Sequence, residues 1–428
     1  MPTLNNIPDG VAEIIPVRSI PWLSQTASPG LIRGGCYLVA GPPGIGKSTL
    51  ANQVAGGLAK HGVKVLYVST EQGLGDLKRG VERIHGRGNG RLSQALRDNY
   101  YIDDSLGDVD NLPRFLTRRV LTDGQDYHGV QVIVIDSVQG RGLASTATQK
   151  YRALYEFIES AKAQGIVTIL IGHVTKKGEI AGPRDLEHNV DCVLYIRSAF
   201  RLRLLFVPKN RFGPASLEPL VLTMDTKGRL RESPHAMAKS CTVYGYGGVG
   251  DALAEGQASI CLPRYGSRPE LNAPFLPAKK VKQLITVLNT LNGVDLNNFS
   301  YEINAYIPGR QAYQQELDLP LTLALLSSYI RRPVPSRTLF VGELDLSRSV
   351  RPPDPGYLTA VANVVIGTQR GKIRQVFIAD QCAEEFSQMQ PEEGGPRVGE
   401  LVQVRGVTRL EQLIGKLWPD LLGRNLDR

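Results

Sequence analysis

Residues 41 to 48 combine the types and the spacing needed to bind phosphate: the segment reads Gly-Pro-Pro-Gly-Ile-Gly-Lys-Ser and matches Gly-x4-Gly-Lys-Ser. Its three glycines allow a tight loop whose backbone N–H groups point at phosphate oxygens. Lys47 would bring a positive charge to the β- and γ-phosphates, and the Ser48 hydroxyl would bind Mg²⁺. The segment therefore predicts a site for a nucleoside triphosphate with Mg²⁺. The predicted nucleotide-binding residues are Gly41, Gly44, Gly46, Lys47, Ser48 and Thr49.

The segments on either side of this loop have the patterns required to hold it. The apolar run from Cys36 to Ala40 is typical of a strand, and Leu50, Val54 and Leu58 recur every four residues, as on one face of a helix. The N-terminus of that helix would add its dipole to the anion site. A chance glycine-rich turn before a helix is the alternative, but strand, loop, Lys-Ser and helix in this order favour the nucleotide site.

Two carboxylates follow strand-like segments and are candidates for the chemistry of hydrolysis. The run 130–135 is apolar and ends at Asp136, the arrangement of a carboxylate that holds Mg²⁺ through water. Glu71 follows the predicted strand 63–69, where a carboxylate could activate the water that attacks the γ-phosphate. Gln72 could orient that water, or Glu71 and Gln72 could be a polar pair on a surface loop.

Three further side chains could complete such a site. His173 ends the predicted strand 166–172 at the same sheet edge and is a candidate sensor of the γ-phosphate, although it could also be a buried histidine with satisfied hydrogen bonds. Lys209 and Arg211 are two residues apart and would share one face of a continuing strand. Such a pair suits a cation delivered to a neighbouring subunit's γ-phosphate. A basic hairpin turn is the alternative.

Length and composition indicate a globular protein. The chain has 428 residues, of which 42% are hydrophobic, enough for two or three domains. It contains no apolar run of about 18 residues and its first ten residues are polar, so we expect a cytoplasmic protein without a membrane partner. The five cysteines are scattered and include no C-x-x-C pair, which indicates neither a disulfide framework nor a cysteine-type zinc site.

Positive charge is modest in total, at +9, but uneven along the chain. Six basic residues stand against one acid between Lys78 and Arg97, and the stretch 192–217 contains no acid. Such stretches suit a polyanionic partner, although a solvated basic face without a partner has the same composition. The basic residues concerned are Lys78, Arg79, Arg83, Arg87, Arg91, Arg97, Arg197, Arg201, Arg203, Lys209 and Arg211.

The order of elements predicts an α/β protein with two domains. From about residue 63 to residue 224, apolar strands alternate with helical segments, as in a doubly wound ATPase core. Pro, Gly and Ser then crowd the chain, and a Gly-x-Gly-x-x-Gly at 245–250 is interpreted as a loop because no helix follows. Helical and strand patterns resume from Lys279. We expect a first domain at 1–232, a linker at 233–254 and a second domain at 255–428.

Seven motifs together resemble the bacterial RadA (Sms) family, strongly over residues 31–230. The Lys-Asn-Arg-Phe-Gly motif is particular to that family. The motifs are Gly-x-Pro-Gly-x-Gly-Lys-Ser-Thr-Leu at 41–50, Lys-Val-Leu-Tyr-Val-Ser-x-Glu at 64–71, Val-Ile-Asp-Ser-Val-Gln at 134–139, Gly-His-Val-Thr-Lys at 172–176, Ala-Gly-Pro-Arg at 181–184, Leu-Glu-His-x-Val-Asp at 186–191 and Lys-Asn-Arg-Phe-Gly at 209–213.

The resemblance implies a RecA-like, Mg²⁺-dependent ATPase of homologous recombination and DNA repair. Relatives of this kind assemble as hexameric rings, encircle single-stranded DNA and drive branch migration, with a recombinase as a further partner. Lys209 and Arg211 would then act on a neighbour's site. The segments 137–150 and 174–184 fall where such proteins carry DNA-binding loops, and Lys176, Lys177 and Arg184 are the DNA-binding candidates.

Two departures from the family pattern limit what the resemblance implies. No cysteine precedes Cys36, so the family's N-terminal four-cysteine zinc motif is missing and we expect no zinc. Gly342 to Pro352 looks like part of the family's Lon-protease-like C-terminal domain, but no lysine occurs between Lys282 and Lys372, so the Ser/Lys dyad of active Lon peptidases is absent. We expect a non-proteolytic domain that supports oligomerisation and DNA binding.

Two other functions compete with a DNA-dependent motor. A regulatory ATPase of the same superfamily, such as a KaiC-type hub, would use its nucleotide state to control protein partners. An ATP-dependent peptidase is disfavoured by the missing dyad. The Lys-Asn-Arg-Phe-Gly motif and the Lon-like segment favour the motor.

Overall fold

The computed structural model describes most of the chain in two compact units. The first unit comprises residues 1–197 and 205–232, and the second comprises residues 198–204 and 233–428. The structure describes residues 13–26, 30–86, 91–105, 112–122, 126–139, 147–173, 189–233, 242–247, 253–264, 267–274, 276–306, 315–367, 372–390 and 395–422. Within these ranges, none of the helices combines the length and the apolar character needed to cross a bilayer.

The first unit is built on a nine-stranded sheet with the order β11-β10-β9-β8-β3-β7-β6-β4-β5. Strands β8, β3, β7, β6, β4 and β5 run parallel to one another, so their carboxyl ends lie at one edge. The strands are β3 (Cys36–Gly41), β4 (Val65–Ser69), β5 (Tyr100–Asp103), β6 (Val132–Asp136), β7 (Val167–His173), β8 (Cys192–Ala199), β9 (Leu202–Asn210), β10 (Ser216–Met224) and β11 (Leu230–Glu232).

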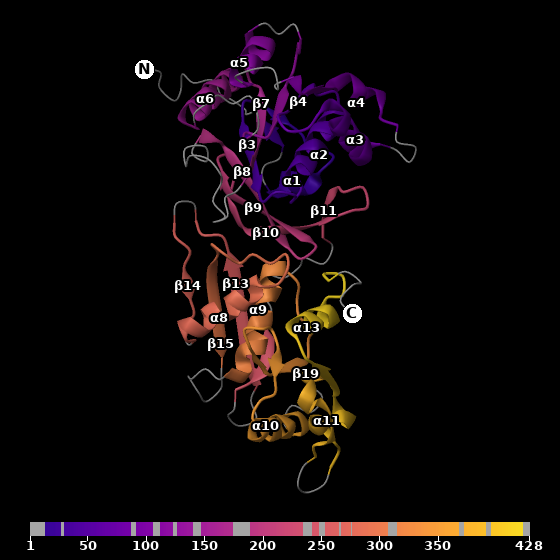
Figure 1. Cartoon of the computed structure of the whole chain (residues 1–428), viewed down its shortest axis with the longest axis vertical. Coiled ribbons are helices and arrows are strands. Elements are labelled where there is room, and N and C mark those ends of the chain that lie inside the picture. The colour runs from indigo at the N-terminus through magenta and orange to yellow at the C-terminus, as the bar shows by residue number, and fades with distance from the viewer. Residues whose placement is uncertain are drawn as a thin grey trace. The chain divides into compact units, whose positions relative to one another are not determined.

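Helices cover both faces of this sheet, which makes it a doubly wound α/β layer structure. Figure 1 shows α2, α3 and α4 on one side of the central strands and α5 with α6 on the other. Every residue of β3, β4 and β6 is buried, as expected for parallel strands with helices on both faces. The helices are α2 (Lys47–Ala59), α3 (Leu74–His85), α4 (Gln94–Asn99), α5 (Leu112–Leu116) and α6 (Ala147–Ala163).

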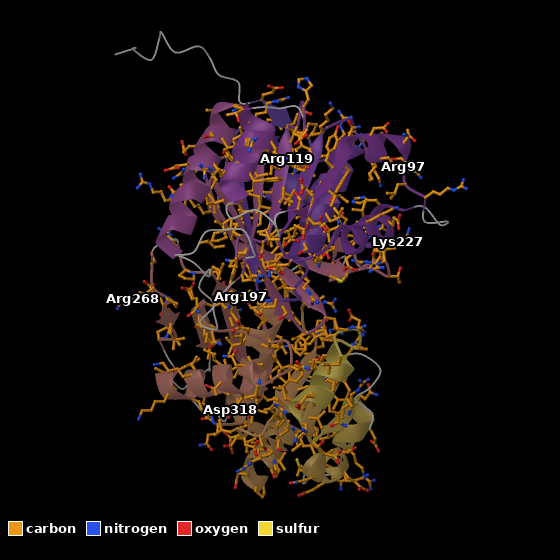
Figure 2. All side chains as sticks on the ribbon, turned by 45° about the horizontal axis from the view of Figure 1, so that its top comes forward. Arg97, Arg119, Arg197, Lys227, Arg268 and Asp318 are labelled. Atoms are coloured by element: carbon orange, nitrogen blue, oxygen red, sulfur yellow. The ribbon has the colours of Figure 1, made fainter. Side chains whose placement is uncertain are left out.

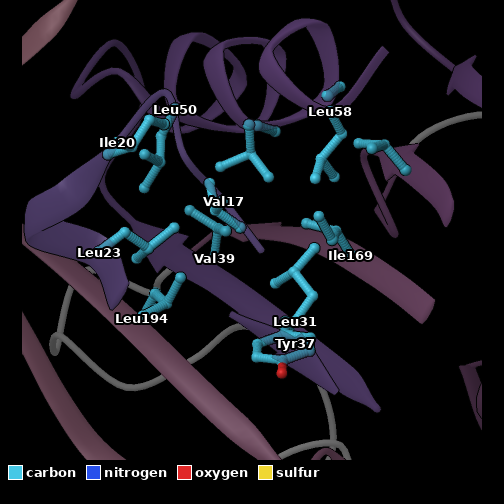
Figure 3. Packing of buried hydrophobic residues seen from close by; sticks show 14 of the residues in the cluster. Val17, Ile20, Leu23, Leu31, Tyr37, Val39, Leu50, Leu58, Ile169 and Leu194 are labelled. Carbon is cyan, nitrogen blue, oxygen red and sulfur yellow. The ribbon is translucent and has the colours of Figure 1, made fainter. Parts of the chain in front are cut away.

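The apolar stripe of α2 packs on the central strands. Figure 3 shows Leu50 and Leu58 of this helix above Val39 of β3 and Ile169 of β7, all of them buried. Burial of each such side chain contributes about 2 kcal/mol, so the first turn of α2 is held firmly against the sheet. That turn carries Lys47, and the core therefore fixes where the predicted phosphate-binding loop ends.

The second unit is an α/β structure around a seven-stranded sheet with the order β14-β15-β13-β12-β16-β19-β20. Strands β12, β16, β19 and β20 are parallel, whereas β13 pairs antiparallel with both β12 and β15. Its main elements are β12 (Val243–Tyr246), β13 (Leu253–Cys261), β14 (Leu271–Asn272), α8 (Ala278–Asn289), β15 (Ser300–Tyr306), α9 (Asp318–Ile330), β16 (Thr338–Val341), β17 (Glu343–Leu344), β18 (Val350–Arg351), α10 (Pro355–Ile366), β19 (Gln375–Ala379), α11 (Asp380–Gln388), β20 (Gln403–Val407) and α13 (Leu410–Leu417).

Part of the stretch 233–254, expected to be a linker, is a strand of this second sheet. β12 pairs with both β13 and β16, and Gly245 lies within it rather than in a loop. A Cβ at Gly245 would lie 2.9 Å from Pro320 Cγ, so the glycine lets α9 approach the strand closely. A glycine that serves close packing has the same sequence pattern as a glycine in a turn, which explains the wrong interpretation.

The segment 338–344 holds two short strands, which are divided at Gly342. β16 belongs to the seven-stranded sheet, whereas β17 pairs with β18 in a separate two-stranded sheet. Gly342 has φ 150°, and a Cβ there would lie 2.9 Å from Val350 Cγ1. The close approach of β18 at this point is the reason for the division.

Candidate functional site

The predicted phosphate-binding loop joins the carboxyl end of β3 to the first turn of α2. Gly44 has φ 73° and Gly46 has φ 110°, the left-handed region that favours glycine. A Cβ at Gly44 would meet nothing within 4 Å, so backbone conformation rather than crowding requires glycine at this position. The loop precedes a helix N-terminus, where backbone N–H groups attract anions.

Lys47 is buried, and its ammonium group is bonded to three neutral acceptors. Its Nζ lies 2.9 Å from the carbonyl oxygens of Gly41 and Pro42 and 3.3 Å from Nδ1 of His173. Because a protonated ammonium only donates, Nδ1 of His173 is the acceptor in this contact. Burial lowers the pKa of Lys47, and the nearby carboxylates of Asp136 and Glu71 oppose that shift. A bound phosphate would give this buried ammonium group a negatively charged hydrogen-bond partner in place of neutral ones.

Asp136 ends β6 beside the loop and is only 8% exposed. The hydroxyl of Tyr67 donates a hydrogen bond of 2.6 Å to its Oδ2, and Ser48 also bonds to the carboxylate. Burial raises the pKa of Asp136, while the hydrogen bonds from Tyr67 and Ser48 lower it. The carboxylate is therefore held in place by neutral donors, and a bound cation would stabilise its ionised form.

The register of the sheet brings Tyr67 to this position. β4 and β6 are paired so that Ser69 lies opposite Asp136, and Tyr67 is two residues before Ser69 on the same face of β4. Tyr67 is fully buried, and its ring stacks on Tyr100 with centroids 6.3 Å apart. Tyr67 was not among the residues predicted from the sequence; the available signal was a tyrosine hydroxyl within the apolar run 65–68.

Glu71 lies at the same edge, beyond the end of β4. Its Oε1 accepts a hydrogen bond of 2.6 Å from Ser137 Oγ and lies 3.6 Å from His173 Nε2. Two hydrogen bonds between Thr70 and Ser137, of 3.0 and 2.9 Å, tie the segments after β4 and β6 together. The Glu71 side chain remains 51% exposed, so water can reach it.

His173 connects the loop lysine to this carboxylate. Nδ1 of the ring meets Lys47 and Nε2 faces Glu71, so one imidazole touches both predicted groups. The backbone N–H of His173 donates to Gln139 Oε1 at 3.2 Å. Gln72 is exposed, and its backbone N–H donates to Ser69 Oγ at 2.8 Å. Four predicted residues, Lys47, Glu71, Asp136 and His173, thus meet at one sheet edge.

The donor set of this edge fits a magnesium nucleotide. Mg²⁺ prefers oxygen ligands, and the hydroxyl of Ser48 and the carboxylate of Asp136 lie together. The raised pKa of Asp136 and the lowered pKa of Lys47 are both consequences of burial, and a bound metal and phosphate would compensate each of them. The residues present are therefore those that could hold Mg²⁺ and a triphosphate.

Lys209 and Arg211 do not join this group. Arg211 follows β9, its backbone N–H donates to Asp191 O at 2.9 Å, and its Nη1 lies 3.1 Å from Asp191 Oδ1. The same carboxylate accepts from the backbone N–H of Cys36, the first residue of β3. Since the phosphate-binding loop begins at the other end of β3, a strand of six residues separates them by about 17 Å. The two cations lie at the edge opposite their own chain's loop.

The remaining predicted residues are the DNA-binding candidates and the basic residues of the stretch 192–217. Lys176, Lys177 and Arg184 lie outside the described residues. Arg197, counted in the basic stretch 192–217, is only 2% exposed within β8 and adds no surface charge, which corrects that part of the prediction (Figure 2). Burial also lowers the pKa of Arg203. Charge counted along a strand does not distinguish its inward-facing residues from its outward-facing ones.

The earlier basic stretch forms an exposed surface where the structure describes it. Lys78, Arg79 and Arg83 lie on α3 and are exposed, and Arg91 and Arg97 are exposed in and before α4. Arg79 pairs with Asp76, and Arg83 donates to the carbonyl of Lys227 at 2.7 Å. Figure 2 labels Arg97 and Lys227 on this part of the unit.

Comparison with known proteins gives one consistent result. Residues 18–228 match a family model described as "ATPase: KaiC". The DNA repair protein RadA of Campylobacter jejuni is 31% identical over 341 residues, covering 75% of this chain and 71% of the relative. RadA of Listeria monocytogenes is 29% identical over 420 residues, covering 94% and 84%. Among solved structures, a DnaB-like replicative helicase matches at 17% identity and a TM-score of 0.43, over 52% of this chain and 62% of that one, a likeness too remote to bear on function.

Proposed function

The chain belongs to the RadA family of DNA repair proteins, and on this premise we propose that it hydrolyses ATP to move along single-stranded DNA and to promote branch migration of recombination intermediates. The observation that carries the proposal is the meeting of Lys47, Asp136, Glu71 and His173 at one sheet edge. A P-loop lysine, a metal carboxylate and a carboxylate open to water are the parts that phosphoryl transfer to water requires.

In the proposed mechanism, Lys47 exchanges its bonds to the carbonyls of Gly41 and Pro42 for bonds to phosphate oxygens. Ser48 and Asp136 would hold Mg²⁺, which would neutralise charge on the phosphates. Glu71 accepts the proton of the attacking water. His173 touches both Lys47 and Glu71, so movement of the lysine toward a phosphate changes the surroundings of the carboxylate, which is how a γ-phosphate sensor would act.

We assign Lys209 and Arg211 to the neighbouring subunit's site. Their position at the edge opposite their own loop supports this assignment, because they cannot reach their own bound nucleotide from there. A head-to-tail ring presents one edge of each subunit to the opposite edge of the next. The proposed assembly is a homohexamer in which each site is completed by the adjacent chain.

The proposed DNA contacts are electrostatic and independent of sequence. Lys176, Lys177 and Arg184 are proposed to track the backbone of single-stranded DNA, and the exposed cations of α3 and α4 add a second positive surface. Each neutralised phosphate releases counterions, so the affinity should fall steeply with salt. A recombinase is the proposed protein partner.

The second unit is proposed to be a Lon-protease-like domain without peptidase activity. The lysine of the Lon dyad has no counterpart between Lys282 and Lys372. The unit would support oligomerisation and DNA binding instead. Hydrolysis of casein by the purified protein with ATP would contradict this proposal.

The test of the main proposal is the steady-state ATPase rate with and without single-stranded DNA, at low and at high salt. We expect stimulation by DNA that is lost at high salt and in Lys209→Ala. The family model that matches the first unit is named for KaiC, which favours one other function, a regulatory ATPase whose nucleotide state controls protein partners. A rate that does not respond to DNA would support that function over the motor.

A further inference from the structure

Asp191 is a buried carboxylate around which the proposed trans-acting turn is built. Its side chain is 5% exposed. Oδ2 accepts a hydrogen bond of 3.0 Å from the backbone N–H of Cys36, and Oδ1 lies 3.1 Å from Arg211 Nη1 and 3.8 Å from Lys162 Nζ. The carboxylate therefore joins the start of β3 to two cations, one of which is the proposed arginine finger.

The backbone of Asp191 makes the same connections as its side chain. Its N–H donates to Cys36 O at 2.8 Å, and its carbonyl accepts from Arg211 N–H at 2.9 Å. Phe212 follows Arg211 in the chain, and its ring packs on Tyr37 of β3 with centroids 5.5 Å apart. A Cβ at Gly35 would lie 2.8 Å from the Phe212 ring. The turn after β9 is thus docked on the first residues of β3 from several directions.

The two side chains of the Asp191–Arg211 pair differ in exposure, and this difference indicates what the pair does. The Asp191 side chain is 5% exposed, whereas that of Arg211 is 53% exposed. A buried carboxylate is costly to leave without a cation, so it holds the guanidinium firmly on one side. The five donors of a guanidinium lie in one plane, so fixing one side also fixes where the exposed side points.

We propose that Asp191 is a positioning residue, which orients the guanidinium of Arg211 for the γ-phosphate in a neighbouring subunit. The inference rests on the proposed function, in which Arg211 acts in trans. Asp191 touches neither nucleotide nor water in this account; it acts through Arg211 alone. A misplacement of about 1 Å in a group that stabilises a transition state costs about 100-fold in rate.

The test uses the full chain and measures both nucleotide binding and turnover. Asp191→Ala should lower the turnover about 10- to 100-fold while the Kd for ATP stays within about twofold, because the P-loop is at the other end of β3. Asp191→Asn keeps the shape but removes the charge, and should lose less. Lys162→Ala is the matched control: it removes the other cation near the carboxylate, and its turnover should stay close to that of the wild type.

Subunit mixing distinguishes a lost position from a damaged fold. Lys47→Ala subunits keep the turn after β9 but have no working loop, whereas Asp191→Ala subunits keep the loop but have a disturbed turn. A mixture should therefore be more active than either protein alone. Arg211→Ala mixed with Lys47→Ala is the reference. If the reference mixture recovers activity but the mixture with Asp191→Ala does not, the role of Asp191 is overturned. If the alanine variant does not fold, Asp191→Asn takes its place in this comparison. No recovery in either mixture would contradict the trans role itself, and the inference would fall with it.

Discussion

The two edges of the nine-stranded sheet hold their cations in different ways. At the carboxyl edge, Lys47 is buried and bonded only to neutral acceptors, two carbonyls and an imidazole. At the opposite edge, Arg211 is half-exposed and bonded to the buried carboxylate of Asp191. A cation with neutral partners can exchange them for a phosphate at little cost, whereas a cation paired with a buried carboxylate keeps its orientation. The edge at Lys47, called the receiving edge, is suited to bind a ligand. The edge at Arg211, called the presenting edge, is suited to hold a side chain out to another molecule.

The largest effect is expected at the receiving edge. Lys47→Ala removes the only cation that the described residues place at the loop, so turnover should fall by at least about 1,000-fold and ATP binding should weaken, as measured by steady-state kinetics and fluorescent-nucleotide titration. Lys60→Ala is the control, because Lys60 follows the same helix at its far end and bonds to His85 O. Turnover within about tenfold of wild type in Lys47→Ala would contradict the assigned role.

Substitutions at the presenting edge should slow hydrolysis and leave ATP binding unchanged. Arg211→Ala should lower the turnover about 1,000-fold with an unchanged Kd for ATP, since a trans-acting arginine stabilises the transition state in a neighbour's site. Arg201→Ala, an exposed arginine of the same acid-free stretch, should behave as wild type. Unchanged turnover in Arg211→Ala would remove the distinction between the two edges.

Glu71 tests the chemistry of the receiving edge separately from its binding. Glu71→Gln keeps a side chain that can accept from Ser137 but is too weak a base to take a proton from water. Turnover should fall about 100- to 10,000-fold with ATP still bound. Glu82→Gln, on α3, is the control. Single-turnover measurements would show whether the chemical step is the one that slows; loss of ATP binding alone would argue against a general base.

Tyr67→Phe should have a smaller effect that depends on pH. The Tyr67 hydroxyl lowers the pKa of Asp136, which burial raises, so its removal should raise that pKa further. The ionised carboxylate is the form that holds Mg²⁺, so the acid limb of kcat/KM should move to higher pH and Mg²⁺ affinity should fall about tenfold. Tyr100→Phe removes a buried hydroxyl for which the described residues provide no hydrogen bond, and should change neither quantity.

The smallest effect on turnover is expected from an ion pair in which the carboxylate is fully buried and the cation is largely buried. In the second unit, Asp318 is fully buried and pairs with Lys280 at 2.6 Å, and the Lys280 side chain is only 14% exposed (Figure 2). Burial raises the pKa of Asp318 to about 6. Lys280→Ala should leave the ATPase rate unchanged but destabilise this unit by about 3 to 5 kcal/mol at pH 8.

The pH dependence of this loss has a definite sign. A carboxyl whose folded-state pKa is raised from 3.8 to about 6 reduces stability as the pH rises through that range, because the unfolded chain ionises first. Without Lys280 the carboxylate loses its partner, so the loss should be smaller at pH 4 than at pH 8 in thermal melts. Lys279→Ala, at the exposed neighbouring position, is the control. Equal losses at both pH values would contradict this account of the pair.

Sequence was most informative about the receiving edge because its residues follow strands whose patterns are strong. The apolar runs before Gly41, Glu71, Asp136 and His173 are buried parallel strands, and such strands bring their carboxyl ends together. The limits of these strands differ from the expected ones by no more than two residues, because hydrogen bonding at the strand ends decides them.

The partners of these residues were not predictable in the same way. Tyr67 reaches Asp136, 69 positions away in the chain, through the register of two strands, and Asp191 bonds to Cys36 across 155 positions. Neither contact leaves a local pattern, because both residues stand among apolar neighbours. The burial of Arg197 and the place of β12 in the second sheet likewise depend on packing between distant segments.

A site completed in trans can be tested by the ATPase rate of the Lys47→Ala and Arg211→Ala proteins, each alone and then as equal mixtures reassembled from separated subunits. If each site is built from one edge of two subunits, random mixing restores about one quarter of the interfaces, and two inactive proteins should give a clear rate together. A mixture no more active than its components, with mixed oligomers verified, would contradict a site completed in trans.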